Sequence, residues 1–465
     1  MYYFSLVPVA LIFAGVAFYS LNSFLLLTVF LVPLSVPLSE LIPGLSFNLY
    51  MPTEPMLLGI LLLFIFKALY DGKLDRRILY HPVSIAIYIN LFWIFLTTLT
   101  STMPVVSVKY LTARIWFLIG FYFLAAHMMK NYRNTHLYLW AYIIPFLIII
   151  VYTLVSLAPF GFLNRDAAHS AMKPFYNDHT SYGAILAMFL FVLLGYFSQK
   201  GRMSNERMVL GFLILFFLFA ITLSYTRATW VSILASIIVF VIIKLRIKFR
   251  TLVIIGLVIG GVLFAYRSQI IMELEQNRQD SSSNMMEHVQ SIYNIKSDPS
   301  NVERLNRWAA ALEMFKERPV VGWGPGTYMF QYAPFQMSYN RTVISTNFGD
   351  WGNAHSEYIG PLAEEGFMGT ISFILIIITV TLTALRVYFR TSSQNIKVLC
   401  LSIYLGLVTY YTYGMLNNLL TRDKAAAHFW GFTAILVAMD IYHKHKTDEE
   451  LKKEEVKGGG SKQKN

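Results

Sequence analysis

The sequence has few charged residues and a single cysteine, and each shortage removes a class of protein. Charged side chains make up 14% of the 465 residues and hydrophobic ones 56%, whereas soluble domains carry roughly 25% charged residues. Such a chain cannot be solvated on all sides, which excludes a soluble enzyme with one anchor and a nucleic-acid-binding domain. Cys400 lies in an apolar run without a second cysteine, which excludes a disulfide scaffold and a thiolate metal cluster.

Several ligand-binding patterns are also missing from the sequence. It has no glycine-rich phosphate loop followed by Lys-Ser or Lys-Thr, and no two-histidine metal motif. It lacks the aspartate-rich sites expected for magnesium-dependent glycosyl transfer, and its apolar segments hold too few acidic residues for a proton-relay pump. We therefore expect neither a metal ion nor a cofactor.

Long apolar runs are what the sequence has instead. Most are near the ~20 residues that a helix needs to cross a bilayer. The runs lie near residues 4–20, 22–39, 54–70, 82–100, 110–129, 137–158, 182–198, 208–225, 228–244, 252–266, 367–388, 397–416 and 425–442. The first two are short, so we predict an all-α polytopic membrane protein with about 12–13 transmembrane helices.

Lysine and arginine gather in alternate connecting segments, and the net charge is +12. This alternation indicates that the basic segments face the cytoplasm. About ten spans are expected within 1–266 and the others within 358–442, with a charged, disordered cytoplasmic tail over 443–465. The poorly charged segments 159–181 and 267–357 are then expected on the exoplasmic side.

The segment 267–357 is a large loop of roughly 90 residues, which is too long for a simple connection. Its middle part has apolar residues at helical spacing from Leu305 to Phe315, which predicts a helix capped by Ser300 or Asn301 and stopped at Arg318-Pro319. The stretch Gly322-Trp323-Gly324-Pro325-Gly326 predicts a tight turn. Asn353-Ala354-His355-Ser356-Glu357 predicts the start of a helix that returns to the membrane.

Three arginines are candidate binding residues at the exoplasmic boundary. Arg227 lies between two apolar runs, where an arginine is costly unless it is paired or wet, and its planar fork suits phosphate. The alternative is an interfacial arginine that extends toward water beside Tyr225 and Trp230. Arg304 and Arg307 lie nearly one turn apart on the predicted loop helix. Packing of that helix on the bundle would bring Arg304 close to Arg227. For Arg307 we favour the alternative of a solvated helix face that pairs with Glu303 and acidic neighbours.

His355 is the candidate general base. Near a helix N-terminus the macrodipole disfavours the imidazolium form, so a neutral ring able to accept a proton is expected at pH 7. The alternative is a structural histidine at the interface.

Four further polar residues are candidates for substrate binding at the same boundary. Asp178 either caps the following helix, which we favour, or orients a hydroxyl together with His179. Lys173 lies in the same short exoplasmic segment, and Arg422 lies among polar residues near the end of the chain. Arg114, inside a span, is a weaker candidate because it can pair within the bundle.

These motifs together resemble the large periplasmic loop of the O-antigen ligase family. The resemblance rests on Arg304-Leu305-Asn306-Arg307-Trp308, on Phe315 with Arg318 to Gly326, and on Asn353-Ala354-His355-Ser356. The stretch Thr226-Arg227-Ala228-Thr229-Trp230 resembles the arginine-bearing motif that precedes that loop. The resemblance covers roughly residues 220–370, does not require a basic residue at Arg307, and does not include Asn177 to Thr180.

The resemblance implies an inverting glycosyltransferase without metal or nucleotide, in the bacterial inner membrane with its site on the periplasmic side. Arg227 and Arg304 would hold the diphosphate of a polyprenyl-diphosphate-linked glycan, and His355 would deprotonate or orient the acceptor hydroxyl. The expected partners are that donor, the lipid A-core or another hydroxyl acceptor, and membrane lipids.

Members of this superfamily differ in their acceptors, and the sequence leaves several alternatives. An O-antigen ligase, which we expect, caps lipid A-core with preassembled glycan. An O-antigen polymerase extends glycan on the lipid carrier, and a protein O-oligosaccharyltransferase modifies proteins. A lipid-linked sugar transporter would use the same arginines only for binding.

Overall fold

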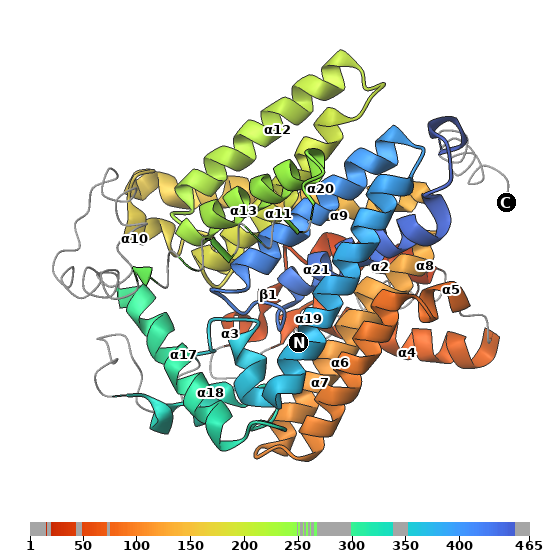
Figure 1. The fold of residues 1–465 in the computed structure, drawn as a ribbon. Coiled ribbons are helices and arrows are strands. Elements are labelled where there is room, and N and C mark those ends of the chain that lie inside the picture. The colour runs from red at the N-terminus through yellow and green to blue at the C-terminus, as the bar shows by residue number, and fades with distance from the viewer. Residues whose placement is uncertain are drawn as a thin grey trace.

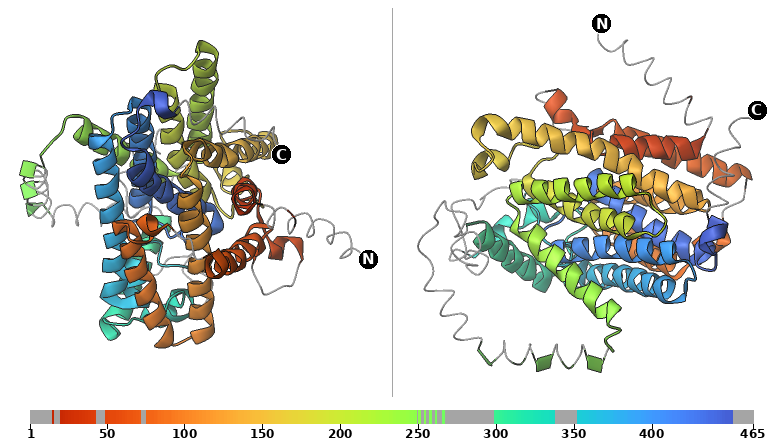
Figure 2. Two further views of the ribbon diagram at one scale, coloured as in Figure 1. Left: turned by 90° about the vertical axis from the view of Figure 1, so that its right-hand side faces the viewer. Right: turned by 90° about the horizontal axis from the view of Figure 1, so that it is seen from above.

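The computed structural model describes residues 20–42, 49–71, 75–248, 299–337 and 352–451, with isolated positions at residue 15 and between 250 and 266. The fold is all-α, as the sequence predicts, and its long helices lie side by side in one bundle (Figures 1 and 2). The longer helices are α2 (Leu21–Leu31), α4 (Thr53–Asp71), α6 (Pro82–Leu99), α7 (Pro104–Leu118), α9 (Tyr132–Leu157), α11 (His179–Ser198), α12 (Ser204–Leu223), α13 (Arg227–Lys244), α17 (Pro299–Glu317), α19 (Ile359–Arg390), α20 (Gln394–Tyr413) and α21 (Asp423–Ala438).

Short elements connect or extend these helices. The two strands pair antiparallel, with Val36 opposite Met51. The short elements are β1 (Val36–Pro37), α3 (Leu38–Leu41), β2 (Tyr50–Met51), α5 (Arg76–Leu79), η2 (Ile119–Leu124), α8 (Ala125–Met128), η3 (Ala158–Phe160), α10 (Arg165–Ala168), α18 (Tyr328–Gln331), η4 (Ala333–Phe335) and η6 (Met439–His443).

Nine helices of the described ranges are long and apolar enough to cross a membrane, which confirms a polytopic membrane protein. They overlap nine of the ten predicted runs from 82–100 to 425–442, the exception being the run near 252–266. The runs near 22–39 and 54–70 correspond to α2, only 11 residues long, and to α4 of 19 residues. The run near 4–20 and most of the run near 252–266 lie outside the described residues, as do most of 267–298 and the tail beyond residue 451.

The loop helix α17 lies at one end of the long helices (Figure 2). It begins at Pro299, before the caps that the sequence suggested, so Ser300 and Asn301 are its second and third residues. Proline suits the first helical position because its missing N–H has no intrahelical partner there. The helix ends at Glu317, immediately before the predicted stop at Arg318-Pro319.

The glycine-rich turn packs against a kink in α19. Gly322, Gly324 and Gly326 all have positive φ angles, so the predicted tight turn is confirmed. Gly324 N–H donates to the Glu364 carbonyl at 2.7 Å, and Phe367 N–H donates to the Pro319 carbonyl at 3.0 Å. α19 is non-helical at Gly366, where a Cβ would lie 2.0 Å from the Val320 carbonyl oxygen. The turn and the kink therefore fix the loop to the membrane bundle.

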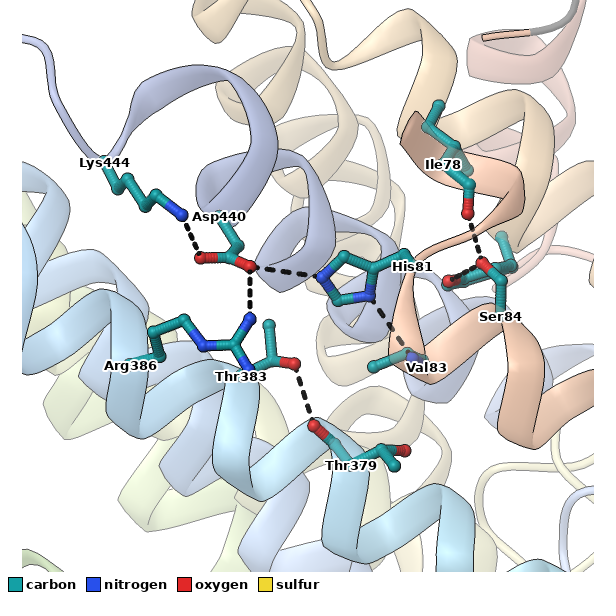
Figure 3. Close-up of polar contacts among 10 residues, drawn as sticks. Ile78, His81, Val83, Ser84, Thr379, Thr383, Arg386, Asp440 and Lys444 are labelled. Atoms are coloured by element: carbon teal, nitrogen blue, oxygen red, sulfur yellow. Dashed lines mark hydrogen bonds and ion pairs between the residues drawn. The ribbon is translucent and has the colours of Figure 1, made fainter. Parts of the chain in front are cut away.

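A buried ionic network joins α6, α19 and η6 at the opposite end of the bundle (Figure 3). The Asp440 side chain, 5% exposed, accepts hydrogen bonds from Arg386 at 3.1 Å and from Lys444 at 2.9 Å. His81 Nδ1 accepts the N–H of Val83 at 3.3 Å, so Nε2 carries the proton toward Asp440 at 3.2 Å. This network connects helix ends that are far apart in the sequence.

Candidate functional site

The predicted polar residues come from segments that meet at one end of the bundle. α11 and α13 begin there, α20 ends there, and α21 begins there. α17 packs beside the start of α19 at the same end. Hydrogen bonds and electrostatic interactions then link the individual side chains.

Arg227 is the first residue of α13 and follows a strained backbone. Tyr225 has φ of 50°, in the left-handed region, which costs a non-glycine residue about 1–3 kcal/mol. The Thr226 hydroxyl donates to the His179 carbonyl at 3.1 Å, which ties the start of α13 to the start of α11. The positive charges of Arg165 and Arg304 both act on Arg227. Arg227 and Arg304 thus lie close enough to interact electrostatically, although 77 positions separate them along the chain.

Arg304 reaches from α17 to the loop between α20 and α21, residues 414–422, which we call the α20–α21 loop. Its Nε donates to the Leu416 carbonyl at 3.2 Å. Burial lowers the pKa of the guanidinium, while the nearby Tyr413 acts in the opposite direction. The side chain of Arg304 is therefore held toward the bundle, which agrees with the predicted packing of the loop helix.

His355 lies in a bend and not at a helix start. α19 begins at Ile359, four residues later, so the sequence-based placement of His355 in the first turn of a helix is wrong. Its φ is 48°, and its N–H donates to the Asn353 side-chain oxygen at 3.0 Å. A left-handed non-glycine residue is strained and persists only where its surroundings hold it. The bend therefore fixes the backbone position that carries the imidazole.

The imidazole of His355 is neutral at pH 7, as expected, but for a different reason. Burial and the positive charges of Arg307 and Arg304 lower its pKa from the ordinary value of 6.5 to about 3. Asp178 acts in the opposite direction, and Arg422 adds to the lowering. Burial first, and then the charge of the neighbouring guanidinium groups, thus keep the ring neutral.

Glu357 fastens the His355 segment to the α20–α21 loop. Its Oε1 accepts three hydrogen bonds, from the Tyr410 hydroxyl at 2.7 Å and from the N–H groups of Leu419 and Leu420 at 2.6 and 2.8 Å. The carboxyl is buried, and burial raises its pKa. The Asn353 side chain also donates to the Asn418 carbonyl, at 3.3 Å. These contacts place His355 beside the residues that Arg304 and Arg422 contact.

Asp178 caps α11, as we favoured, and also forms an ion pair. Its Oδ1 accepts the N–H of Ser181 at 2.7 Å, and its Oδ2 lies 3.2 Å from an Arg422 nitrogen. Burial alone would raise the pKa of Asp178, but Arg422 and the hydrogen bonds from Thr180 and Ser181 hold it well below its usual value. Asp178 is therefore ionised and joins α11 to the α20–α21 loop.

Arg307 forms the predicted ion pair with Glu303, but the pair is buried, so the expected solvated face is wrong. Its Nε lies 2.7 Å from Glu303 Oε1, and another of its nitrogens donates to the Asn353 carbonyl at 3.1 Å. The side chain is buried beside Tyr332 and lies under Gly352. Arg307 thus supports the segment that carries His355, and its charge acts on that imidazole.

The remaining two candidates differ in their surroundings. His179 stacks on His169 with ring centroids 3.9 Å apart, and the charges of Arg165 and Arg304 act on it. Lys173 is exposed, and its backbone carbonyl accepts the Tyr152 hydroxyl at 2.8 Å. His179 therefore belongs to the same cationic cluster, whereas the described contacts do not connect the Lys173 ammonium to it.

The resulting cluster contains five arginines, Arg165, Arg227, Arg304, Arg307 and Arg422, around His355 and His179. Guanidinium groups gathered in a partly buried site bind diphosphate and stabilise charge on a leaving group. Within the residues that the structure describes, no group of three or more His, Cys, Asp or Glu side chains is placed to hold a metal ion.

Two residues at this site were not predicted as site residues from the sequence. Glu357 was interpreted only as part of a helix start, and Arg165 was not among the candidates. A glutamate next to a membrane span is a recognisable signal because its burial requires partners. No sequence pattern marks Arg165, because α10 is only four residues long and is too short to show a periodic pattern.

Comparison with known families agrees with these motifs. Residues 211–374 match the sequence model of a family described as O-antigen ligase. Residues 211–374 are thus similar to the O-antigen ligase family. This region contains Arg227, α17, the glycine-rich turn and His355, whereas Asp178 and Arg422 lie outside it. The resemblance to the O-antigen ligase family is thereby confirmed over the stretch that carries it. The search of curated proteins found no match for the chain.

The family match over residues 211–374 supports a coarse functional assignment. The family belongs to the superfamily of O-antigen ligases, O-antigen polymerases and oligosaccharyltransferases, whose members are glycosyltransferase-like bacterial enzymes. Together with the apolar helices, the match indicates a multi-pass membrane protein, and it is consistent with membrane lipids and lipid-linked glycans as partners.

Proposed function

We propose that this protein is an O-antigen ligase, a metal-independent, inverting glycosyltransferase of the bacterial inner membrane with its site on the periplasmic side. It transfers a preassembled glycan from polyprenyl diphosphate to the lipid A-core. The observation that carries the proposal is that hydrogen bonds hold the segments of Arg227, Arg304 and His355 at one end of the bundle. There the charge of Arg304 acts on both Arg227 and His355.

In the proposed reaction, Arg227 and Arg304 bind the donor diphosphate. The acceptor oxygen attacks the anomeric carbon, and the bond from that carbon to the diphosphate oxygen breaks. Polyprenyl diphosphate leaves with the electron pair of that bond, and the acceptor proton passes to His355. The two guanidinium groups stabilise the negative charge that develops on the leaving oxygen, so a general acid is unnecessary.

Donor binding itself makes His355 a better base. Positive charge from Arg307 and Arg304 contributes to the pKa of about 3 in the unliganded site. A diphosphate beside these groups neutralises that charge, which raises the pKa of His355 toward its ordinary range. Burial, the larger cause of the low pKa, remains, so the base is stronger but not fully restored when donor is present.

The test uses the purified protein with polyprenyl-diphosphate glycan, lipid A-core and a chelator. We expect capped lipid A-core from the wild type and a loss of about 10²-fold or more for Arg227→Ala, Arg304→Ala and His355→Ala. His127→Ala and Arg390→Ala are the matched controls because both side chains are exposed near the other end of the bundle. Normal capping by His355→Ala would reject the proposed base.

The acceptor separates the proposed ligase from its relatives. Elongated glycan that remains on the lipid carrier would identify a polymerase, and glycan on a protein acceptor would identify a protein O-oligosaccharyltransferase. Movement of lipid-linked glycan across vesicles without a new glycosidic bond would identify a transporter. In cells, loss of a ligase leaves long carrier-linked polymer, whereas loss of a polymerase leaves single repeats.

A further inference from the structure

A groove lies at the end of α11, α13 and α20 opposite the cationic cluster. These helices pack against one another (Figure 1). His179, Arg227 and Tyr413 mark their ends at the cluster, and Ser198, Lys244 and Gln394 mark the other ends. The groove has a volume of about 660 Å³, within the roughly 300–1,000 Å³ of small-molecule sites. It is thus a separate cavity and not part of the site described above.

The groove has one polar end and a long apolar wall. Lys244 and Lys397 line the polar end, and Lys397 lies 5.0 Å from the Tyr388 ring centroid. Leu194, Ile237 and Phe240 are side chains of the apolar wall, and each is more than a third exposed. A site with two cations at one end and hydrocarbon along its length is complementary to an anionic amphiphile.

The floor of the groove is closed by a tight helix contact. At Gly195, an added Cβ would lie 2.5 Å from the Ser402 Cβ, so α11 and α20 approach closely there. The Ser402 hydroxyl donates its hydrogen to the Val398 carbonyl at 2.8 Å, within α20. The floor therefore offers no unsatisfied donor to water, and a hydrocarbon chain suits it better than a polar ligand.

The length of the wall matches one leaflet. Ile237 precedes Lys244 by seven positions and Leu405 follows Lys397 by eight, which corresponds to roughly 10–12 Å at 1.5 Å per residue. Half of a hydrocarbon core is about 15 Å thick. The lysines thus stand at the level of lipid headgroups when the wall lies in the adjoining leaflet.

We propose that this groove binds an anionic glycerophospholipid of that leaflet. The headgroup phosphate lies between Lys244 and Lys397, and one acyl chain lies along the wall formed by α11, α13 and α20. The bound lipid braces the three helices whose other ends carry His179, Arg227 and Tyr413. Neither lysine contributes to the cationic cluster.

The test is native mass spectrometry of the purified full chain after detergent exchange, with added phosphatidylglycerol, phosphatidylcholine or inorganic phosphate. We expect one retained phosphatidylglycerol, little phosphatidylcholine, and thermal stabilisation by phosphatidylglycerol but not by inorganic phosphate. Lys244→Gln with Lys397→Gln should weaken phosphatidylglycerol retention about 30-fold, at about fivefold for each lysine near the membrane surface. Lys67→Gln with Lys130→Gln, which removes two exposed charges outside the groove, is the matched control.

A second variant tests the apolar wall with the charges intact. Leu194→Trp fills the groove from a residue that is 37% exposed, so the bundle can accept it, and it should abolish retention of phosphatidylglycerol. Retention unchanged in both the lysine and the tryptophan variants would overturn the proposal. Equal loss in the control pair, equal retention of phosphatidylcholine, or equal stabilisation by inorganic phosphate would also overturn it.

Discussion

Glu357 is the residue whose removal should most clearly separate positioning from chemistry. Glu357→Ala removes the acceptor of the Tyr410 hydroxyl and of the Leu419 and Leu420 N–H groups. Each buried group left without a partner costs about 1–3 kcal/mol. We therefore expect the three groups together to cost at least about 3 kcal/mol of stability. Water that enters the site offsets the rest of their summed cost. Glu357→Gln retains one acceptor oxygen and should lose about 1 kcal/mol.

The same change should displace the α20–α21 loop. This loop contains Arg422 and the Leu416 carbonyl that accepts a hydrogen bond from Arg304. A displacement of about 1 Å in a catalytic group can cost 10²-fold in rate. We expect about that loss for Glu357→Ala and less than 10-fold for Glu357→Gln.

The assays are glycan transfer by the purified protein and thermal unfolding in detergent, with exposed Glu449→Ala as the control. Wild-type stability and activity in Glu357→Ala would refute the reasoning. A large loss of activity with unchanged stability would instead assign Glu357 to the chemistry.

Three further predictions concern the kink, the ionic network and acid sensitivity. Gly366→Ala should lower the free energy of unfolding by at least about 2 kcal/mol, because the added Cβ would meet the Val320 carbonyl and the backbone φ is positive. Gly161 also has a positive φ but lies in open space, so Gly161→Ala should cost about 1 kcal/mol. Denaturant unfolding measures both. Asp440→Ala should destabilise by about 1–3 kcal/mol, because it leaves the buried His81 ring without its acceptor while the partly exposed Arg386 and Lys444 can be solvated. An unchanged melting temperature would contradict the network in Figure 3. The folded-state pKa of His355 is about 3 against an ordinary 6.5, so folding favours the neutral ring, and this stabilisation is lost as the pH falls below 6.5. Acidification from pH 6.5 to 4 should therefore lower the melting temperature of the wild type more than that of His355→Gln, and equal shifts would contradict the lowered pKa.

The electrostatics of the cluster also give the proposed enzyme an order of events. Arg307 and Arg422 have carboxylate partners in Glu303 and Asp178, while the charge of Arg304 acts on both Arg227 and His355. An anion beside Arg304 therefore changes the acidity of His355 directly. Donor binding before proton transfer follows from this arrangement, and a pH profile that shifts upward with donor would support it.

The sequence by itself determined what depends on neighbouring residues. Hydropathy marked the nine helices of the described ranges that can cross a membrane, because each apolar run carries its own burial signal. Local signals likewise predicted the end of α17 before Arg318-Pro319 and the turn from Gly322 to Gly326, since proline and glycine act on the backbone where they stand. Asp178 was assigned correctly as a cap because capping joins residues two or three positions apart.

Only the tertiary structure decided how distant segments meet. Arg304 and the Leu416 carbonyl are 112 positions apart, and Glu357 and Leu419 are 62 apart. No periodicity encodes such contacts, because they arise when separate helices pack into one bundle. The bend at His355 shows the same limit: the local pattern predicted a helix start, but hydrogen bonds to the α20–α21 loop hold the segment in a strained, non-helical conformation. The pKa of His355 likewise depends on arginines from other segments, and therefore on packing rather than on its own position in the chain.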